Sequence, residues 1–439
     1  MGVPSSVDSR TQLTAGQMAT DDHKSSERVV VIGSGWRFAS GISHYTYLLS
    51  CALKDEYDVG ALLMRRLVPR RLYPGRDHVG AAVATAVAYP PDVPVYDGVD
   101  WYWGPSMTDA LRYLDRQRPT VVIFQWWSGA VLHTYLRLAR YAARHGARII
   151  LEWHEGQDTG EAAMPAARLY VNALMPRLLS LVAAHVVHSS FDAQAIPAAY
   201  PLGNAIVRVM PHGPYHHVVT SETARAEAGD ESPFRLLYFG VIRPFKGVED
   251  LVAAFSSLDR DQASQFRLSV VGETWEGWTI PDEAIARSPH TDLIERVDRY
   301  VSDEELAAYV AAADAIVLPY HRSSLSGPLH IALTAGLPVI VTAVGGLVEV
   351  VRDYAGATLV PPQDPAALRA TLLELPARRG QRYANPHSWQ QTLDGYRALI
   401  SEVCETRGGR SRTTAASPVP DRAGGTDHAS RAQLGSSRR

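Results

Sequence analysis

The chain has 439 residues, of which 46% are hydrophobic and 20% are charged. This composition excludes a largely disordered chain, and the length favours two domains over a single core. The formal net charge of -3 gives no general attraction to nucleic acid, so we expect no nucleic-acid partner. The two cysteines, Cys51 and Cys404, are too few for a disulfide framework, which predicts a cytoplasmic location.

The first half of the chain alternates apolar runs with helical stretches between two tails. Residues 1–27 and 406–439 lack large apolar side chains in a periodic pattern, which predicts disorder at both ends. The runs that read as buried parallel strands are 28–32, 120–124, 147–151 and 185–188, with helices at about 42–54 and 135–145. We therefore expect residues 28–225 to form a Rossmann-like domain with helices on both faces of a parallel sheet.

The same pattern restarts in the second half. A stretch rich in Glu, Ala, Gly and Asp at 221–232 marks the expected boundary, which we place between residues 225 and 226. The expected strands that follow are 234–239, 267–271, 315–318 and 338–341, with helices near 248–258, 303–312 and 329–335. The predicted fold class is therefore α/β, with a second Rossmann-like domain at 226–386, both domains being doubly wound parallel sheets.

The first candidate ligand loop is the glycine-rich turn at 33–41. Open parallel sheets bind ligands at the carboxyl ends of their strands, where helix N-termini favour anions. Phe38 stands where the dinucleotide fingerprint requires its third glycine, which disfavours an NAD site. Gly35 and Gly41 are candidate donor contacts because glycine lets backbone amides approach a ligand; the alternative is that they only permit the turn.

A second loop carries paired cations after a predicted strand. Arg243 and Lys246 lie between Gly240 and the next helix. Two cations at this position can neutralise a leaving diphosphate, whereas the alternative is a solvated loop with incidental charges. The sequence favours the binding interpretation because strand, glycine and cations occur together.

Two further loops of the second half are candidate donor contacts. Ser326 and Gly327 open a predicted helix, where a hydroxyl and free amides can meet phosphate oxygens; an ordinary helix cap would also use Ser326. Glu349 follows a diglycine turn, where its carboxylate can cap amides or accept from a hydroxyl.

A candidate reaction centre follows the strand at 147–151. Glu152, His154, Glu155 and Asp158 gather at its carboxyl end. His154 is the candidate catalytic residue, since imidazole can bind substrate hydroxyls or move protons; the alternative is a capping or exposed loop residue.

Other histidines and a basic segment have less specific patterns. His185 and His188 are expected to be structural, and the histidine-rich turn at 211–217 lacks a carboxylate partner, so we predict no metal site. The segment 65–76 carries Arg65 and Arg76 among its five arginines and is the candidate for peripheral membrane contact. The alternative is a solvated basic loop.

Residues 29–396 resemble the retaining glycosyltransferases of family four, also described as glycosyl transferases group 1. The resemblance rests on SGISHY at 40–45, the His154 loop, FGVIRPFKGVEDL at 239–251, and SGPL, AGLPVI and GGLVEVV beyond residue 325. It implies the GT-B fold, with two Rossmann-like domains facing across a cleft and a final helix at 387–405 that packs back on the first domain. It also implies that Arg243 and Lys246 bind the donor diphosphate and that His154 lies by the transferred sugar.

The resemblance implies a hexosyltransferase that acts on a nucleotide-diphosphate-sugar donor with retention of configuration, without metal or cofactor. The acceptor class would be a glycan, a lipid-linked glycan or a metabolite. The family often has two glutamates where this sequence has Ser323 and Ile331, so donor contacts are expected to differ. The alternatives are a nucleotide-sugar-binding protein without transferase activity and an epimerase of the same fold.

Overall fold

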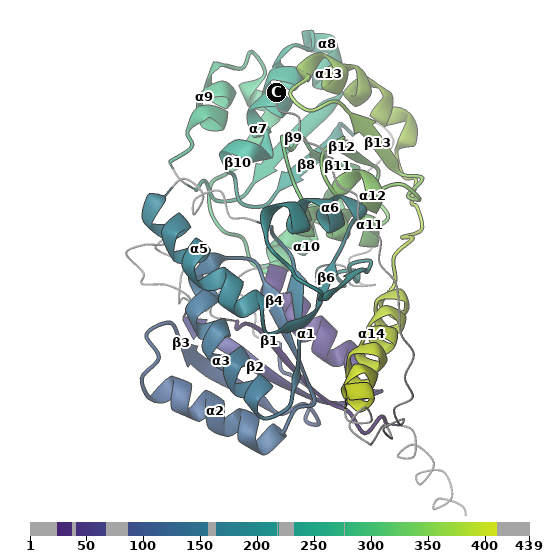
Figure 1. Cartoon of the computed structure of the whole chain (residues 1–439). Helices are drawn as coiled ribbons and strands as arrows, with labels where there is room; N and C mark the ends of the chain where they lie inside the picture. The colour runs from purple at the N-terminus through teal and green to yellow at the C-terminus, as the bar shows by residue number, and fades with distance from the viewer. Residues whose placement is uncertain are drawn as a thin grey trace, which may run out of the picture.

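The computed structural model describes residues 24–36, 41–66, 87–156, 164–216, 218, 232–275 and 277–410. Two α/β domains stack on each other, and the last helix runs back along the first domain (Figure 1). Each domain is built on its own parallel sheet. The predicted fold class is confirmed.

The first domain is a seven-stranded sheet of order β3-β2-β1-β4-β5-β6-β7. Its strands are β1 (Arg28–Ser34), β2 (Asp58–Arg66), β3 (Val95–Asp100), β4 (Val121–Trp126), β5 (Arg148–Trp153), β6 (Val182–Val187) and β7 (Ile206–Val209). Its helices are α1 (Gly41–Leu53), α2 (Pro105–Gln117), α3 (Leu132–Arg144), α5 (Pro165–Leu179) and α6 (Ser190–Ala199). The central strands are buried on both faces, which explains their continuous apolar sequences.

The second domain has a six-stranded sheet of order β10-β9-β8-β11-β12-β13. Its strands are β8 (Phe234–Phe239), β9 (Phe266–Val271), β10 (Ile294–Val297), β11 (Ala315–Leu318), β12 (Val339–Thr342) and β13 (Ala357–Val360). Its helices are α7 (Val248–Ser256), α8 (Arg260–Ser264), α9 (Ile280–Arg287), α10 (Asp303–Ala312), α11 (Gly327–Thr334), α12 (Leu347–Val350) and α13 (Pro365–Glu374). The boundary expected at 225/226 lies outside the described residues.

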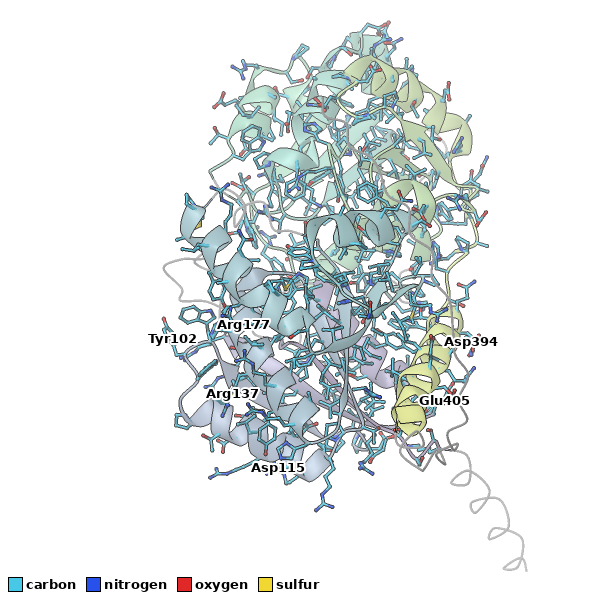
Figure 2. All side chains as sticks on the ribbon, in the orientation of Figure 1. Tyr102, Asp115, Arg137, Arg177, Asp394 and Glu405 are labelled. Carbon is cyan, nitrogen blue, oxygen red and sulfur yellow. The ribbon has the colours of Figure 1, made fainter. Side chains whose placement is uncertain are left out.

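The final helix, α14 (Trp389–Arg410), begins and ends later than the predicted 387–405. It lies against the first domain: the indole Nε1 of Trp389 donates to the carbonyl of Pro214 at 3.0 Å, and Thr392 Oγ1 donates to that of Pro211 at 2.9 Å. Asp394 and Glu405 lie on its exposed side (Figure 2). The helix that follows the second domain in the sequence therefore packs against the first domain.

The carboxyl ends of β8 and β9 come together at two glycines. Gly272 has a φ of +147°, and a Cβ added there would lie 2.0 Å from the carbonyl oxygen of Gly240. Neither the backbone conformation nor the space accepts a side chain. This close approach brings the loops after both strands to one edge of the sheet.

We expect Gly272→Ala to destabilise the second domain by about 2–3 kcal/mol, because it adds backbone strain to a clash with a carbonyl. The change should lower the midpoint of thermal unfolding measured by calorimetry. Gly277→Ala is the matched control, since Gly277 also has positive φ, +65°, but open space around its Cβ position; it should cost about 1 kcal/mol. Equal effects of the two changes would contradict the close-approach argument.

Candidate active site

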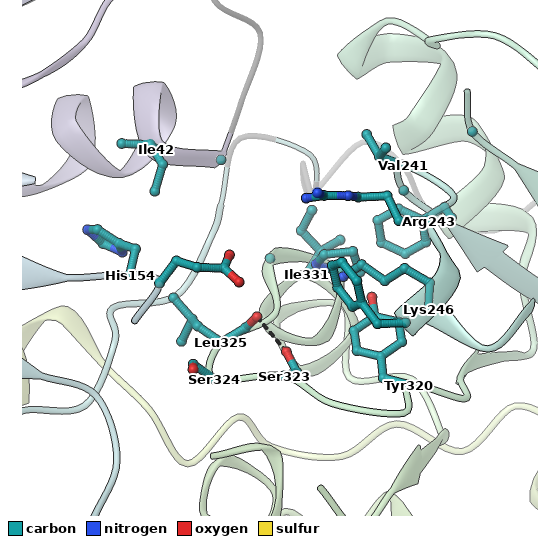
Figure 3. Close-up of a pocket in the computed structure, with 18 of the residues that line it drawn as sticks. Ile42, His154, Val241, Arg243, Lys246, Tyr320, Ser323, Ser324, Leu325 and Ile331 are labelled. Atoms are coloured by element: carbon teal, nitrogen blue, oxygen red, sulfur yellow. Dashed lines mark hydrogen bonds between the residues drawn. The ribbon is translucent and has the colours of Figure 1, made fainter. Parts of the chain in front are cut away.

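A cavity of about 850 Å³ lies between the two domains, at the carboxyl ends of both sheets. The first domain contributes the start of α1 and the loops after β4 and β5; the second contributes the loops after β8, β9 and β11 (Figure 3). The lining includes Gly41, Ile42, His44, Trp127, His154, Glu155, Gly240, Arg243, Lys246, Gly272, Glu273, Arg322, Ser323, Gly327 and Ile331. The cavity is therefore the place where the strand-end loops of both domains meet.

The second-domain wall is basic. Arg243 and Lys246 flank a short 3-10 turn, η3 (Pro244–Lys246), that leads into α7. Lys246 Nζ lies 3.8 Å from the ring centroid of Tyr320, and the guanidinium of Arg243 lies 5.1 Å from that of Phe245. Aromatic faces can hold cations in place without neutralising them. The predicted pairing of Arg243 and Lys246 at one site is thus present in the geometry.

Arg322 is a third cation in this wall and was not predicted. Its guanidinium lies 4.7 Å from the Phe245 centroid, so the Phe245 ring contacts both arginines. Arg322 follows β11 by a few residues, in the same strand-end position that singled out Arg243. Its place shortly after a predicted strand was therefore the feature of the sequence that could have identified Arg322 as a site residue.

In the serine-rich loop before α11, only one of the two predicted donor contacts lines the cavity. Ser326 is buried, and its Oγ accepts a hydrogen bond from the amide of Leu329 at 3.2 Å, so its side chain caps α11 instead of lining the cavity. Gly327 does line the cavity. So do Ser323 and Ile331, at the positions where glutamates were considered; Ser323 Oγ donates to the carbonyl of Leu325 at 2.8 Å (Figure 3).

Gly35 also lies away from the cavity lining. Its amide donates to the carbonyl of Met64 at 2.9 Å, and a Cβ at this position would lie 2.8 Å from Asp97 Oδ1. Gly35 therefore serves close packing of the β1 and β2 ends. Gly41 differs: it begins α1, lines the cavity, and accepts a hydrogen bond from Tyr215 Oη through its carbonyl at 3.0 Å.

Glu349 joins the two domains instead of lining the cavity. Its carboxylate accepts hydrogen bonds from the amides of Ser190 at 2.8 Å and Phe191 at 2.9 Å, the first amides of α6. Burial raises the pKa of Glu349, but these amide hydrogen bonds outweigh that effect and hold the pKa below its usual value. The expected capping of amides is present, on a helix of the other domain.

We expect Glu349→Gln to cost about 1 kcal/mol of interdomain stability, because a neutral amide interacts less with the N-terminus of α6. The lowered pKa means that the carboxylate's contribution is complete above the usual value of 4.5 and is lost as the pH falls through the lowered value. Thermal unfolding from pH 7 to pH 3 should therefore show a wild-type advantage that disappears in acid. Glu374→Gln, at the last residue of α13, is the control for the change of residue type.

His154 is held by a buried hydrogen-bond chain beneath the cavity. Its Nε2 lies 2.5 Å from Gln125 Oε1, and Gln125 Nε2 donates to Glu152 Oε2 at 2.6 Å. The other oxygen, Glu152 Oε1, accepts from Tyr45 Oη at 2.7 Å. Burial, followed by the nearby His188, lowers the pKa of His154 well below its usual value. His154 is therefore a neutral ring whose orientation is set by Gln125.

Three more buried histidines surround this chain: His188, which was expected to be structural, His212 of the turn at 211–217, and His330. The rings of His212 and His330 stack with centroids 4.4 Å apart, and His188 lies 5.1 Å from His212. The pKa of His330 is lowered to about 3, mainly because the ring is buried. Because His330 lies on α11, the stack joins the two domains.

Among the described residues, Glu152, His154 and His188 are the set of ligating groups close enough together to hold a metal ion. The turn at 211–217, considered for a metal, contributes no member to this set within the described part of the chain. The basic segment 65–76 lies largely outside the described residues; Arg65 itself pairs with Asp100, with Nη2 and Oδ2 2.6 Å apart. Its contact with a membrane is therefore untested, and no helix in the described ranges has the length and hydropathy of a membrane span.

Comparison with known proteins identifies the second domain. Residues 233–377 match the family model described as glycosyl transferases group 1. This match confirms, for the second domain, the resemblance predicted from the sequence. The motifs that carried the resemblance there, including the Arg243 and Lys246 loop, lie within the matched residues.

Two sequence relatives extend the comparison. The chain is 31% identical over 198 residues to a D-inositol 3-phosphate glycosyltransferase of Segniliparus rotundus, spanning 43% of that protein. It is 28% identical over 376 residues to the protein of the same description from Streptomyces coelicolor, with 72% of this chain and 82% of that one covered. The chain thus spans less than half the length of the first relative and most of the second.

Solved structures show the same fold over nearly the whole chain. Sucrose-phosphate synthase from Thermosynechococcus elongatus aligns with a TM-score of 0.57 at 17% identity, covering 88% of this chain and 98% of that one. The Anabaena protein HepE in complex with UDP-glucose aligns with a TM-score of 0.55 at 14% identity, covering 87% and 99%. The chain has the GT-B fold that the resemblance implied.

Proposed function

We propose that the chain is a glycosyltransferase that moves a sugar from a nucleotide-diphosphate-sugar donor to an acceptor across the interdomain cavity. The observation that carries the proposal is the placement of Arg243 and Lys246 on one wall of the cavity and His154 on the other. Cations on a strand-end loop suit a leaving diphosphate, and a neutral ring opposite them suits an uncharged sugar. The family match of the second domain supports the same activity.

The donor's diphosphate would lie against the second domain. Arg243 and Lys246 reach the cavity from η3, and Gly327 opens it to the N-terminus of α11, where the helix dipole favours phosphate oxygens. These groups would stabilise charge as it develops on the leaving diphosphate. We propose that they do so without a metal ion at the diphosphate.

The acceptor would then enter on the side of the first domain. Ile42, His44 and Trp127 line that side, and an aromatic face such as that of Trp127 packs well on a sugar or a lipid-linked group. We propose a glycan, a lipid-linked glycan or a metabolite as acceptor. The name of a Xanthomonas campestris relative, a GDP-mannose:glycolipid 4-beta-D-mannosyltransferase 36% identical over 119 residues, supports the lipid-linked option.

Retention of the anomeric configuration is proposed on family precedent. Attack from the same face as the leaving diphosphate needs no carboxylate nucleophile. The acidic residue next to His154 in the described cavity lining is Glu155, and the proposed route assigns it no nucleophilic role. Nuclear magnetic resonance of the product linkage tests this point. An inverted linkage would refute retention but would leave the proposed transferase activity unchanged.

We expect Arg243→Ala and Lys246→Ala each to weaken binding of the cognate nucleoside diphosphate about tenfold or more, since a charged hydrogen bond to phosphate contributes about 1.5–3 kcal/mol. Calorimetric titration of UDP, GDP, ADP and dTDP into the wild type identifies the nucleotide first. Arg287→Ala, an exposed arginine of α9 paired with Glu283, is the control and should bind as the wild type does. Unchanged affinity in both cavity variants would remove the donor site from this wall.

We expect His154→Asn to lower kcat by about 10²-fold or more while leaving nucleoside diphosphate affinity unchanged, because His154 lies on the sugar side of the cavity. The readouts are turnover with the cognate donor and calorimetric affinity for the nucleotide. His145→Asn, at the exposed end of α3, is the control. Wild-type turnover in His154→Asn would contradict the assignment.

The same assays separate the alternatives. Ser323 and Ile331 line the cavity where the family often has glutamates, which favours a nucleotide-sugar-binding protein as the second candidate. That protein would bind the diphosphate and the sugar donor without turnover in the presence of any acceptor. An epimerase would instead convert the donor sugar with no acceptor present.

A further inference from the structure

Three ligating groups lie buried together beneath the cavity, at the carboxyl ends of β5 and β6. Glu152, His154 and His188 are 0%, 6% and 7% exposed. One ligand atom from each lies within 4.8 Å of the others, and His188 Nε2 is 3.6 Å from Glu152 Oε1. Buried carboxylates and imidazoles at such separations need an explanation, because burying a charged group is costly unless it is compensated.

The hydrogen bonds around His154 fix which of its nitrogens carries the proton. Glu152 Oε2 can only accept when ionised, so the neighbouring NH₂ group of Gln125 faces it and Gln125 Oε1 faces His154. Nε2 of His154 must then donate to Gln125. This leaves Nδ1 with a free lone pair, and Nδ1 is buried with no hydrogen-bond partner in the described part of the chain.

His188 shows the same arrangement from the other strand end. Its Nδ1 lies 3.1 Å from the carbonyl oxygen of Met210, which can only accept, so Nδ1 carries the proton. Nε2 then has the lone pair, and it is likewise buried without a hydrogen-bond partner among the described residues. Two imidazole lone pairs and a carboxylate therefore lie close together, and neither histidine donates to Glu152, whose oxygens accept from Tyr45 and Gln125.

We propose that Glu152, His154 and His188 bind a divalent transition-metal ion, with Zn²⁺ as the best fit. Two neutral imidazoles and a carboxylate are a common zinc ligand set. Ligand atoms about 2.1 Å from a tetrahedral ion lie about 3.4 Å apart, close to the 3.6 Å between His188 Nε2 and Glu152 Oε1.

The surrounding groups have the arrangement that orients metal ligands. The other nitrogen of each histidine donates to an oxygen, that of Gln125 or that of Met210, and Tyr45 donates to the Glu152 carboxylate. The ion would join the ends of β5 and β6 and fix the His154 ring in the cavity wall. It would lie away from Arg243 and Lys246, so this site is separate from the proposed metal-free diphosphate site; it shares only His154 with the proposed function, and zinc binding is measured without donor or acceptor.

The test is titration of ZnCl₂ into the full chain, purified without a histidine tag and stripped of metal. We expect one equivalent to bind with micromolar affinity or better, a rise in the midpoint of thermal unfolding, and a Co²⁺ complex with the intense visible absorption of a four-coordinate site. His188→Asn should weaken zinc affinity at least tenfold. Its side-chain NH₂ can still donate to the carbonyl of Met210, so the fold contact is kept.

His185→Asn is the matched control, on β6 and three residues before His188. His185 is also buried, but its Nδ1 accepts from Trp153 Nε1 at 3.1 Å, a bond that the asparagine oxygen can replace, and it lies outside the three-residue cluster. It should bind zinc as the wild type does. Absence of zinc binding in the wild type, or equal affinity in wild type and His188→Asn, would overturn the proposal.

Discussion

The buried carboxylate of Glu152 is the constraint on which the floor of the cavity depends. It is fully buried, and it receives hydrogen bonds from Tyr45 on α1 and Gln125 on β4 while facing His188 beyond the end of β6. A buried carboxylate is tolerated only when such partners are held in place. Through Gln125 the same carboxylate sets the orientation of His154. The position of this ring in the cavity wall therefore depends on Glu152, a group that the substrate need not contact.

Most of the fold could be predicted because its central strands are buried on both faces. Such strands are mainly apolar, as β4, β5, β8 and β11 are, and glycines directly follow β8 and β9. Edge strands gave no such signal: β7 is mostly exposed and lies at the end of its sheet. The final helix extends beyond its expected end at residue 405: residues 406–410 are helical although their polar composition predicted a disordered tail.

The residues of the candidate site could be predicted where their position in a single loop at a strand end was sufficient evidence. Arg243, Lys246, Gly327, Gly41 and His154 each follow or open an element at a strand end, and all line the cavity. Ser326 and Glu349 have equally suitable positions in the sequence, but their side chains cap helices. The difference depends on which helix start lies nearest in space. The stack of His212 on His330 and the approach of His188 to Glu152 join residues far apart in the chain, so no local pattern could reveal them. Glu152 and His154, in contrast, lie at the end of one strand and were grouped from the sequence.

The docking of α14 makes the two domains a doubly connected pair. The chain crosses into the second domain beyond residue 218 and returns at Trp389, and Trp389 and Thr392 bond to the carbonyls of Pro214 and Pro211, just before the first crossing. The returning chain therefore lies beside Pro211 and Pro214 of the first domain. Separating the domains would therefore require breaking the Trp389 and Thr392 hydrogen bonds as well as those of Glu349 to the first amides of α6.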